Sequence, residues 1–168
     1  MFYGTVDEAT AYFAERLHET AWTDADPSDR PKALQAATRI IDTLNFKGDK
    51  HSAWLLFRDR KRHSLEQIHA AEAAQALEFP RDADIEVPEE IRIACFEIAH
   101  ALLDGRDPEL EVEALAITQQ NYGSVQTSYS RAGSPLEHVA NGVPSVMAWR
   151  LLRPFLRSSD EITFSRVS

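Results

Sequence analysis

Two stretches of the sequence repeat apolar residues at three- and four-residue steps, and these repeats constrain the fold more than any other feature. Such spacing places one apolar face along a helix, and that face must be buried against another element. Pro31 and Pro88 fall in the expected first turns, and Gly48 and Gly105 follow the expected ends. The two faces are Ala33, Leu34, Ala37, Ile40, Ile41 and Leu44, and Ile91, Ala94, Cys95, Ile98, Ala99 and Leu102. They predict two helices that form the core of a mainly α protein.

Three further helices are predicted from their ends. Residues 5–8 match a capping box, in which Thr and Glu side chains satisfy free backbone N–H groups. This helix should carry one apolar face and end at residues 23–27; the face is Val6, Ala9, Phe13 and Leu17. Residues 107–109 indicate a short helix, and residues 143–145 open the last one, which Pro154 ends or kinks.

The middle of the chain has weaker patterns. Residues 45–57 are predicted to be an irregular, aromatic connection. Residues 58–77 indicate a helix with a basic start and a weak apolar period, so we expect an exposed or partner-bound element. Pro80 disfavours the helical region for Phe79, so this helix should end in an extended segment.

Residues 116–134 differ from the helical segments on both sides because they are rich in Thr, Gln, Ser, Tyr and Gly. Val125, Thr127 and Tyr129 alternate with polar residues, which is typical of a strand, and Gly123 lies where a turn would precede it. We expect an extended loop or β-hairpin. The fold class is therefore a small helical bundle with this loop or hairpin and a C-terminal arm. The length of 168 residues favours one domain, which we place at residues 1–157, with the arm at 158–168.

The formal net charge is −9, from 18 Lys and Arg against 27 Asp and Glu, which disfavours a protein that grips nucleic acid over its whole surface. The charge is uneven: residues 1–30 are acidic, whereas residues 58–62 and the segment from Arg150 are basic. This asymmetry favours complementary surfaces for protein partners, although each cluster can equally be a solvated face. No apolar run approaches the length of a membrane span, and the N-terminus lacks secretory features, so we expect a reducing compartment.

Motifs for catalysis are few. The chain has no Gly-rich phosphate loop and no nucleophile elbow, and its six His residues are isolated or badly spaced for zinc. Cys95 fits a small buried core residue better than a reactive thiol. Acidic residues at alternate positions, as in 109–113, diverge on a helix and fit a solvated face. We therefore expect no enzyme, no metal and no cofactor.

Residues 54–62 allow two interpretations. Trp54 and Phe57 beside four basic residues resemble a platform for single-stranded nucleic acid, with rings that stack on bases and cations that contact phosphates. The alternative is that Trp54 and Phe57 pack in the core. The single basic cluster favours core packing, because channels for single strands usually carry more basic residues.

Several short motifs follow one another in a recognisable order. They are Tyr3-Gly4-Thr5 with Tyr12-Phe13; residues 32–42; Leu77-Glu78-Phe79-Pro80-Arg81; Val87-Pro88-Glu89-Glu90-Ile91 leading into residues 94–102; Gly123-Ser124-Val125 with Tyr129; and residues 151–156. This order resembles that of head–tail connector proteins (adaptor or head-completion proteins) of tailed bacteriophages. Members of one such group are often described as DnaT-like single-stranded-DNA-binding proteins. Residues 58–74 depart from the resemblance, because they are longer and more charged than expected.

The resemblance implies a structural virion protein made in the bacterial host cytoplasm. Such proteins form a ring, commonly of twelve copies, between the portal and the tail or a stopper or tail-terminator ring. Double-stranded DNA passes through the lumen without specific binding, and a net negative charge suits this because it repels the duplex. No membrane is involved. The alternative function is a single-stranded-DNA-binding replication accessory.

Two sets of residues are candidates for contacts in such an assembly. Pro154 should free the chain after it to reach a portal, where the basic residues favour an acidic partner and the apolar residues, including Leu156, act as anchors. The alternative is that Phe155 and Ile162 fold back onto the protein's own helices. The portal candidates are Arg150, Arg153, Arg157, Ile162, Phe164 and Val167. The candidates for contact between copies or with a tail protein are Gln119, Gln120, Tyr122, Val125 and Tyr129.

Overall fold

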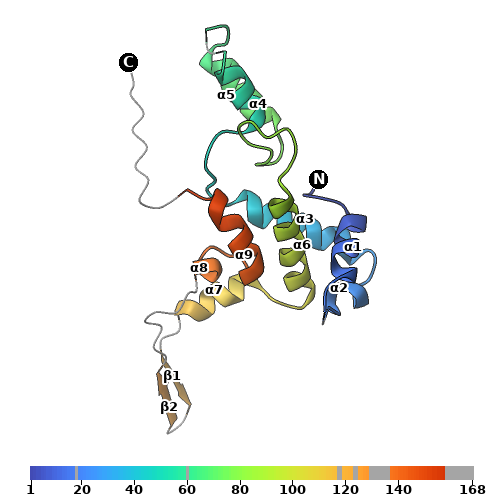
Figure 1. The fold of residues 1–168 in the computed structure, drawn as a ribbon. Helices are drawn as coiled ribbons and strands as arrows, with labels where there is room; N and C mark the ends of the chain where they lie inside the picture. The colour runs from blue at the N-terminus through green and yellow to red at the C-terminus, as the bar shows by residue number, and fades with distance from the viewer. Residues whose placement is uncertain (18, 60, 117–118, 123–124, 129–136, 158–168) are drawn as a thin grey trace.

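The computed structural model describes the chain except residues 18, 60, 117–118, 123–124, 129–136 and 158–168. Helices dominate, with one two-stranded antiparallel sheet, so the prediction of a mainly α bundle with a hairpin is confirmed (Figure 1). In chain order the elements are α1 (Val6–Ala14), α2 (Ala21–Asp24), α3 (Asp29–Asp42), α4 (His51–Phe57), α5 (Leu65–Ala74), α6 (Glu89–Leu103), α7 (Pro108–Ala116), β1 (Gln119–Tyr122), β2 (Val125–Ser128), α8 (Glu137–Ala140), α9 (Val146–Leu152) and the 3-10 helix η1 (Arg153–Phe155).

The body of the molecule consists of α1, α2, α3, α6 and α9. Helix α6 lies at its centre and packs against α3, α9 and α2. The two apolar faces predicted from the sequence meet here: Ile41 and Ile98 are fully buried, and Ile40, Leu44 and Leu102 lie half-buried at the margins. Leu152 of α9 closes the core from a third side.

The N-terminal helix is shorter than the sequence predicted. The Thr5 hydroxyl accepts a hydrogen bond from the Glu8 N–H at 3.1 Å, while the Glu8 carboxylate pairs with Arg92 at 2.7 Å. Helix α1 then ends at Ala14, before residues 23–27, and Leu17 is 82% exposed, so both its predicted end and the place of Leu17 on the buried face were wrong. The buried Trp22 of α2 packs on Phe13 instead, with ring centroids 5.2 Å apart.

Helices α4 and α5 form an arm that extends from one end of the body, as Figure 1 shows. The prediction of an irregular segment at 45–57 was wrong from His51 onward, where α4 begins. The helix predicted at 58–77 is also shorter: residues 58–59 and 61–63 lie in the turn at the outer end, and a capping box of Ser64 and Gln67 begins α5. The extended segment predicted around Phe79 is present, with a cis Phe79–Pro80 bond, and Phe79 is buried.

Helix α7 and the β1–β2 hairpin lie at the opposite end of the molecule (Figure 1). The strands pair in register from Gln119 opposite Ser128 to Tyr122 opposite Val125, which confirms the expected hairpin. The turn expected at Gly123 and the strand residue Tyr129 fall outside the described residues.

The chain does not leave the body at Pro154. Phe155 and Leu156 pack against the core, and Leu156 forms a bridge with Phe46. The Lys47 N–H donates to the Phe155 carbonyl at 2.9 Å, and the Arg157 N–H donates to the Asn45 carbonyl at 2.9 Å. The prediction that Pro154 frees the chain after it was therefore wrong for residues 155–157, and the alternative, that Phe155 folds back onto the body, is confirmed. Ile162, Phe164 and Val167 lie outside the described residues.

Candidate assembly surfaces

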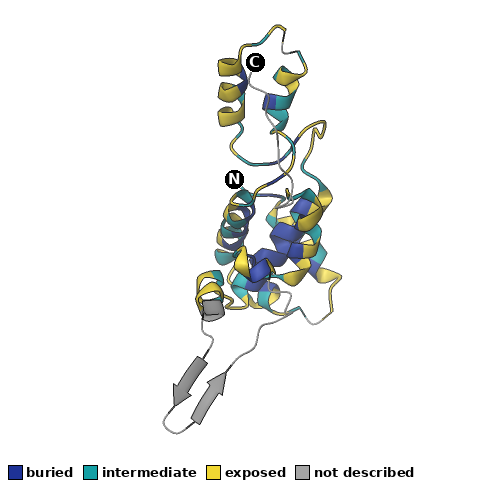
Figure 2. Cartoon of the chain, turned by 90° about the vertical axis from the view of Figure 1, so that its left-hand side faces the viewer, coloured by how far each residue is buried: buried dark blue, intermediate teal, exposed yellow. Residues whose placement is uncertain are grey.

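The arm has a very small interior of its own. Ala53 of α4 and Ile68 of α5 are buried between the two helices. Leu55 is 49% exposed and Leu65 is 56% exposed, both close to the outer end. Figure 2 shows that α5 is mostly exposed and α4 mostly intermediate, in contrast to the buried centre of the body. The arm therefore presents apolar surface that its own fold does not cover.

The outer end of the arm is basic. Arg58, Lys61 and Arg62 are exposed in the turn, and Arg62 pairs with Asp59 at 3.2 Å. We define the tip as these three cations with Leu55 and Leu65. Most described residues between 58 and 77 are exposed, which agrees with the first alternative predicted for this segment, an exposed element. The second alternative, a partner-bound element, stays a prediction.

The aromatic residues of α4 lie on the arm and not in the core of the body. Trp54 is half-buried, and the Arg58 guanidinium lies over its ring, 4.7 Å from the centroid. The His51 ring stacks near Trp54 with centroids 6.0 Å apart. Phe57 is exposed by about half, so the interpretation that Phe57 packs in the core was wrong. A cation over an aromatic ring is favourable within the protein and occupies one face of Trp54.

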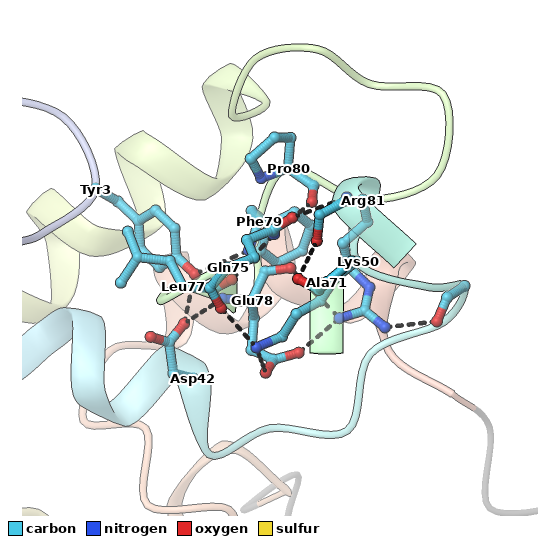
Figure 3. A network of polar contacts seen from close by, with 12 residues as sticks. Tyr3, Asp42, Lys50, Ala71, Gln75, Leu77, Glu78, Phe79, Pro80 and Arg81 are labelled. Atoms are coloured by element: carbon cyan, nitrogen blue, oxygen red, sulfur yellow. Dashed lines mark hydrogen bonds and ion pairs between the residues drawn. The ribbon is translucent and has the colours of Figure 1, made fainter. Parts of the chain in front are cut away.

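A network of polar contacts joins the arm to the body (Figure 3). We call it the base network and define it as Tyr3, Asp42, Lys50, Gln75, Glu78 and Arg81. The Tyr3 hydroxyl donates to the Asp42 carboxylate and accepts from the Phe79 N–H at 3.2 Å. The Glu78 N–H also donates to Asp42, at 3.3 Å. Segments separated by more than thirty residues in the chain are thereby held together.

Arg81 and Lys50 anchor the other half of this network. Arg81 donates to the carbonyls of Lys47 at 2.8 Å and Gly48 at 2.5 Å, and pairs with Glu78 at 2.6 Å. Lys50 pairs with Glu78 at 3.1 Å and donates to the Gln75 carbonyl at 3.1 Å. Charged hydrogen bonds in a half-buried setting are stronger than exposed ones. They fix where α4 begins and where α5 ends.

Burial changes the acid–base properties of two groups in the base network. Loss of water contact raises the pKa of the Asp42 carboxyl, and the hydrogen bonds from Tyr3 and Glu78 offset this only in part. Burial, together with the neighbouring Asp42, raises the pKa of the Tyr3 hydroxyl far above its usual range. The tyrosine therefore stays protonated and acts as a donor. The contacts of the Tyr3 hydroxyl with Asp42 and Phe79 are structural.

A groove lies between α3, the end of α6, α7 and the residues after α8. Its volume is about 870 Å³, and Ala36, Ile40 and Leu102 contribute apolar side chains to it. Asp107, Glu109, Glu113 and Arg39 also line it, so its charge is mainly acidic. We call this the lower groove. The sequence analysis identified the acidic run of 109–113 as a solvated face but did not predict the groove.

The C-terminal basic residues do not form one cluster. Arg153 and Arg157 line a hollow of about 480 Å³ with Lys47 and Glu137, and Arg153 lies 3.9 Å from Glu137. Arg150 is exposed on α9 and is not among the residues that line this hollow. Two of the three described portal candidates are thus brought together.

The candidates Gln119, Gln120, Tyr122 and Val125 lie on the paired strands of the hairpin. Their backbone positions are described, and Tyr129 is not. Their proposed contact with another protein stays a prediction.

Sequence analysis missed a buried carboxylate in the body. Glu97 of α6 accepts hydrogen bonds from the Tyr12 hydroxyl at 2.7 Å and from Arg16 at 2.8 Å. Burial, with the neighbouring Glu97, raises the pKa of Tyr12 to about 12. The Arg16 partner leaves Glu97 paired, so this group joins α1 to α6. No local pattern reveals it, because Arg16 and Glu97 are 81 positions apart.

Cys95 is a buried core residue, as predicted. Burial raises the pKa of its thiol to about 12, so the reactive thiolate is scarce at neutral pH. Within the described residues, no group of three or more His, Cys, Asp or Glu could hold a metal ion. Across the same residues, no helix has the length and apolar character required to cross a membrane.

Comparison with known proteins gave no match: neither a family model, nor a curated protein, nor a solved structure resembles the chain significantly.

Proposed function

We propose that this protein is a structural connector of a tailed-bacteriophage virion, which forms a ring between the portal and the tail and lines the DNA channel. One observation carries the proposal. The arm and the β1–β2 hairpin extend from opposite ends of a packed helical body (Figure 1). A ring subunit placed between two other rings needs such elements, because it must contact neighbours above, below and beside it.

The energetics of the arm support this role. Its interior contains little more than Ala53 and Ile68, while Leu55 and Leu65 remain exposed. Apolar side chains gathered at the end of a projection are a typical mark of a protein–protein contact.

The net charge and the order of the sequence motifs also support the proposed connector function. The net charge of −9 suits a conduit that repels the passing duplex. The ordered motifs that resemble phage connectors span residues 3–156, including the Leu77–Arg81 segment at the base of the arm. By that resemblance the ring has twelve copies, and its partners are a portal protein and a tail or stopper protein.

A single-stranded-DNA-binding accessory is the second candidate. The basic tip, where Arg58 lies over Trp54, is the observation that favours it. The two functions differ in what they require: a connector needs ring formation and portal binding, whereas an accessory needs salt-sensitive affinity for oligonucleotides.

Negative-stain electron microscopy tests the proposal, on the purified protein alone and mixed with portal rings from the phage that encodes it. We expect rings with a central opening that cap the portal. A protein that forms no ring and leaves the portal bare, while binding labelled single-stranded oligonucleotides with an affinity that falls as salt rises, would show that the accessory function is correct.

Truncation after Arg157 tests the portal contact separately. Because the Arg157 N–H makes the last described bond to the body, removal of residues 158–168 should leave the fold intact. We expect a soluble protein with the wild-type melting temperature that no longer co-sediments with portal rings. Co-sedimentation at wild-type affinity would exclude the C-terminal segment as the portal contact.

A further inference from the structure

The tip of the arm combines two properties. Leu55 and Leu65 are each about half exposed, and Arg58, Lys61 and Arg62 surround the same turn. Exposed apolar side chains beside positive charges bind best to an apolar surface beside negative charges, because the charges then select the partner and set the register.

The lower groove has the complementary properties. Ile40, Leu102 and Val112 line it with apolar atoms, and Asp107, Glu109 and Glu113 supply acidic groups. Val112 is 40% exposed in the groove, and Leu110, also on α7, is 62% exposed. Its volume of about 870 Å³ is large enough to take several side chains from the end of a helical hairpin.

The two surfaces lie on opposite sides of the body. Figure 1 shows α4 and α5 beyond one end of α3 and α6, and α7 with α8 beyond the other. The tip therefore cannot reach the lower groove of its own chain while the body is folded. Two complementary surfaces that lie far apart on one chain suit a contact between successive copies.

We propose that the tip of one copy docks into the lower groove of the next copy. The contact is heterologous, since different surfaces meet, and a repeated heterologous contact closes into a ring when its rotation divides a full turn. The inference rests on the proposed function in that it names the surfaces that join ring subunits. If the tip–groove contact is wrong, the subunits could still form a ring through other surfaces.

Cross-linking tests the pairing directly. An Arg62→Cys protein and an affinity-tagged Glu113→Cys protein are mixed and treated with a short thiol-specific bifunctional reagent. Cys95 is buried in both and should not react. We expect a mixed dimer in good yield, and far less product from either variant alone. Equal yields in all three samples, or no cross-link at all, would overturn the inference.

A charge swap tests the energetics, with self-association measured by sedimentation velocity. The tip variant is Arg58→Glu, Lys61→Glu and Arg62→Glu, and the groove variant is Glu109→Lys and Glu113→Lys. Each should raise the dissociation constant for self-association by about 100-fold, and the chain with all five changes should recover to within about tenfold of wild type. The matched control, Glu15→Lys with Asp24→Lys, changes one exposed acid directly after α1 and one at the end of α2, and it should leave association unchanged.

The outcomes separate the two proposals. Rings that persist in electron micrographs despite failed cross-linking and a failed swap would overturn the tip–groove contact and leave the connector function intact. Tip variants that lose affinity for labelled single-stranded DNA while wild-type self-association is absent would overturn the contact in favour of nucleic acid at the tip. A tip–groove cross-link without rings on portals supports the contact and counts against the connector function.

Discussion

The body and the arm are built from the same kind of element but are stabilised in different ways. In the body, α3, α6 and α9 share a continuous apolar interior that includes fully buried Leu34, Ile41 and Ile98. In the arm, two short helices bury Ala53 and Ile68 and depend on polar contacts at their base. We therefore expect the body to be stable without the arm, and the arm, with few buried apolar side chains, to have the lower local stability. Low local stability is typical of elements that become ordered or buried when a partner binds.

The largest expected effect comes from a charge in the core of the body. Ile41→Asp should cost at least about 4 kcal/mol of unfolding free energy, because it places an unpaired carboxylate among apolar neighbours. Leu55→Asp on the arm is the control and should cost less than about 0.5 kcal/mol, since that position is half exposed. Thermal denaturation followed by circular dichroism measures both. If the two variants melt alike, the contrast between body and arm is wrong.

The next effect concerns the base network. Arg81→Met should cost about 3 kcal/mol, because it leaves the Lys47 and Gly48 carbonyls without their donor and the Glu78 carboxylate with Lys50 as its remaining partner. Arg92→Met removes an ion pair of similar length between half-exposed groups, so it should cost less than about 1 kcal/mol. Urea denaturation compares them. If Arg92→Met lowers the unfolding free energy as much as Arg81→Met, the base network contributes no more to stability than an exposed ion pair.

A smaller and local effect is expected inside the arm. Ile68→Ala should weaken the packing of α5 on α4 by about 2 kcal/mol, which corresponds to roughly 30-fold faster amide exchange in the arm. Exchange in α3 and α6 should remain as in wild type, because the body does not depend on the arm. Hydrogen–deuterium exchange with mass spectrometry reads both regions in one experiment. Faster exchange throughout the chain would mean that body and arm unfold as one unit.

The smallest effect is a pH dependence. Because the pKa of Asp42 is raised in the folded protein, the folded state holds this proton to higher pH than the unfolded state does. Its contribution to stability is therefore present at low pH and is lost as pH rises through the folded pKa, above the ordinary value of 3.8. Asp42→Asn keeps an acceptor for Tyr3 but does not ionise. We expect the stability of this variant, relative to wild type, to increase as pH rises from about 4 to about 7 in chemical denaturation. A constant difference would contradict the assignment.

Local patterns in the sequence determined the elements that form the body. The apolar repeats of 33–44 and 91–102 predicted α3 and α6 and their buried faces. The reason is that a helix with one apolar face must turn that face toward the core. Alternation in 125–129 predicted a strand, and β1 with β2 confirms the hairpin. The buried state of Cys95 followed from its place on the α6 repeat.

Tertiary contacts decided the rest. Helix α4 is only seven residues long and has no clear apolar period, so its helical state depends on packing against α5 and on the base network. The return of Phe155 and Leu156 to the core depends on Phe46 and Phe79, which are distant in sequence. The sequence indicated the tip through its basic cluster. It did not indicate the lower groove, because residues of α3, α6, α7 and the segment after α8 form the groove together. Periodicity records which residues a single element must bury, whereas grooves and ion pairs between distant segments depend on how the elements meet.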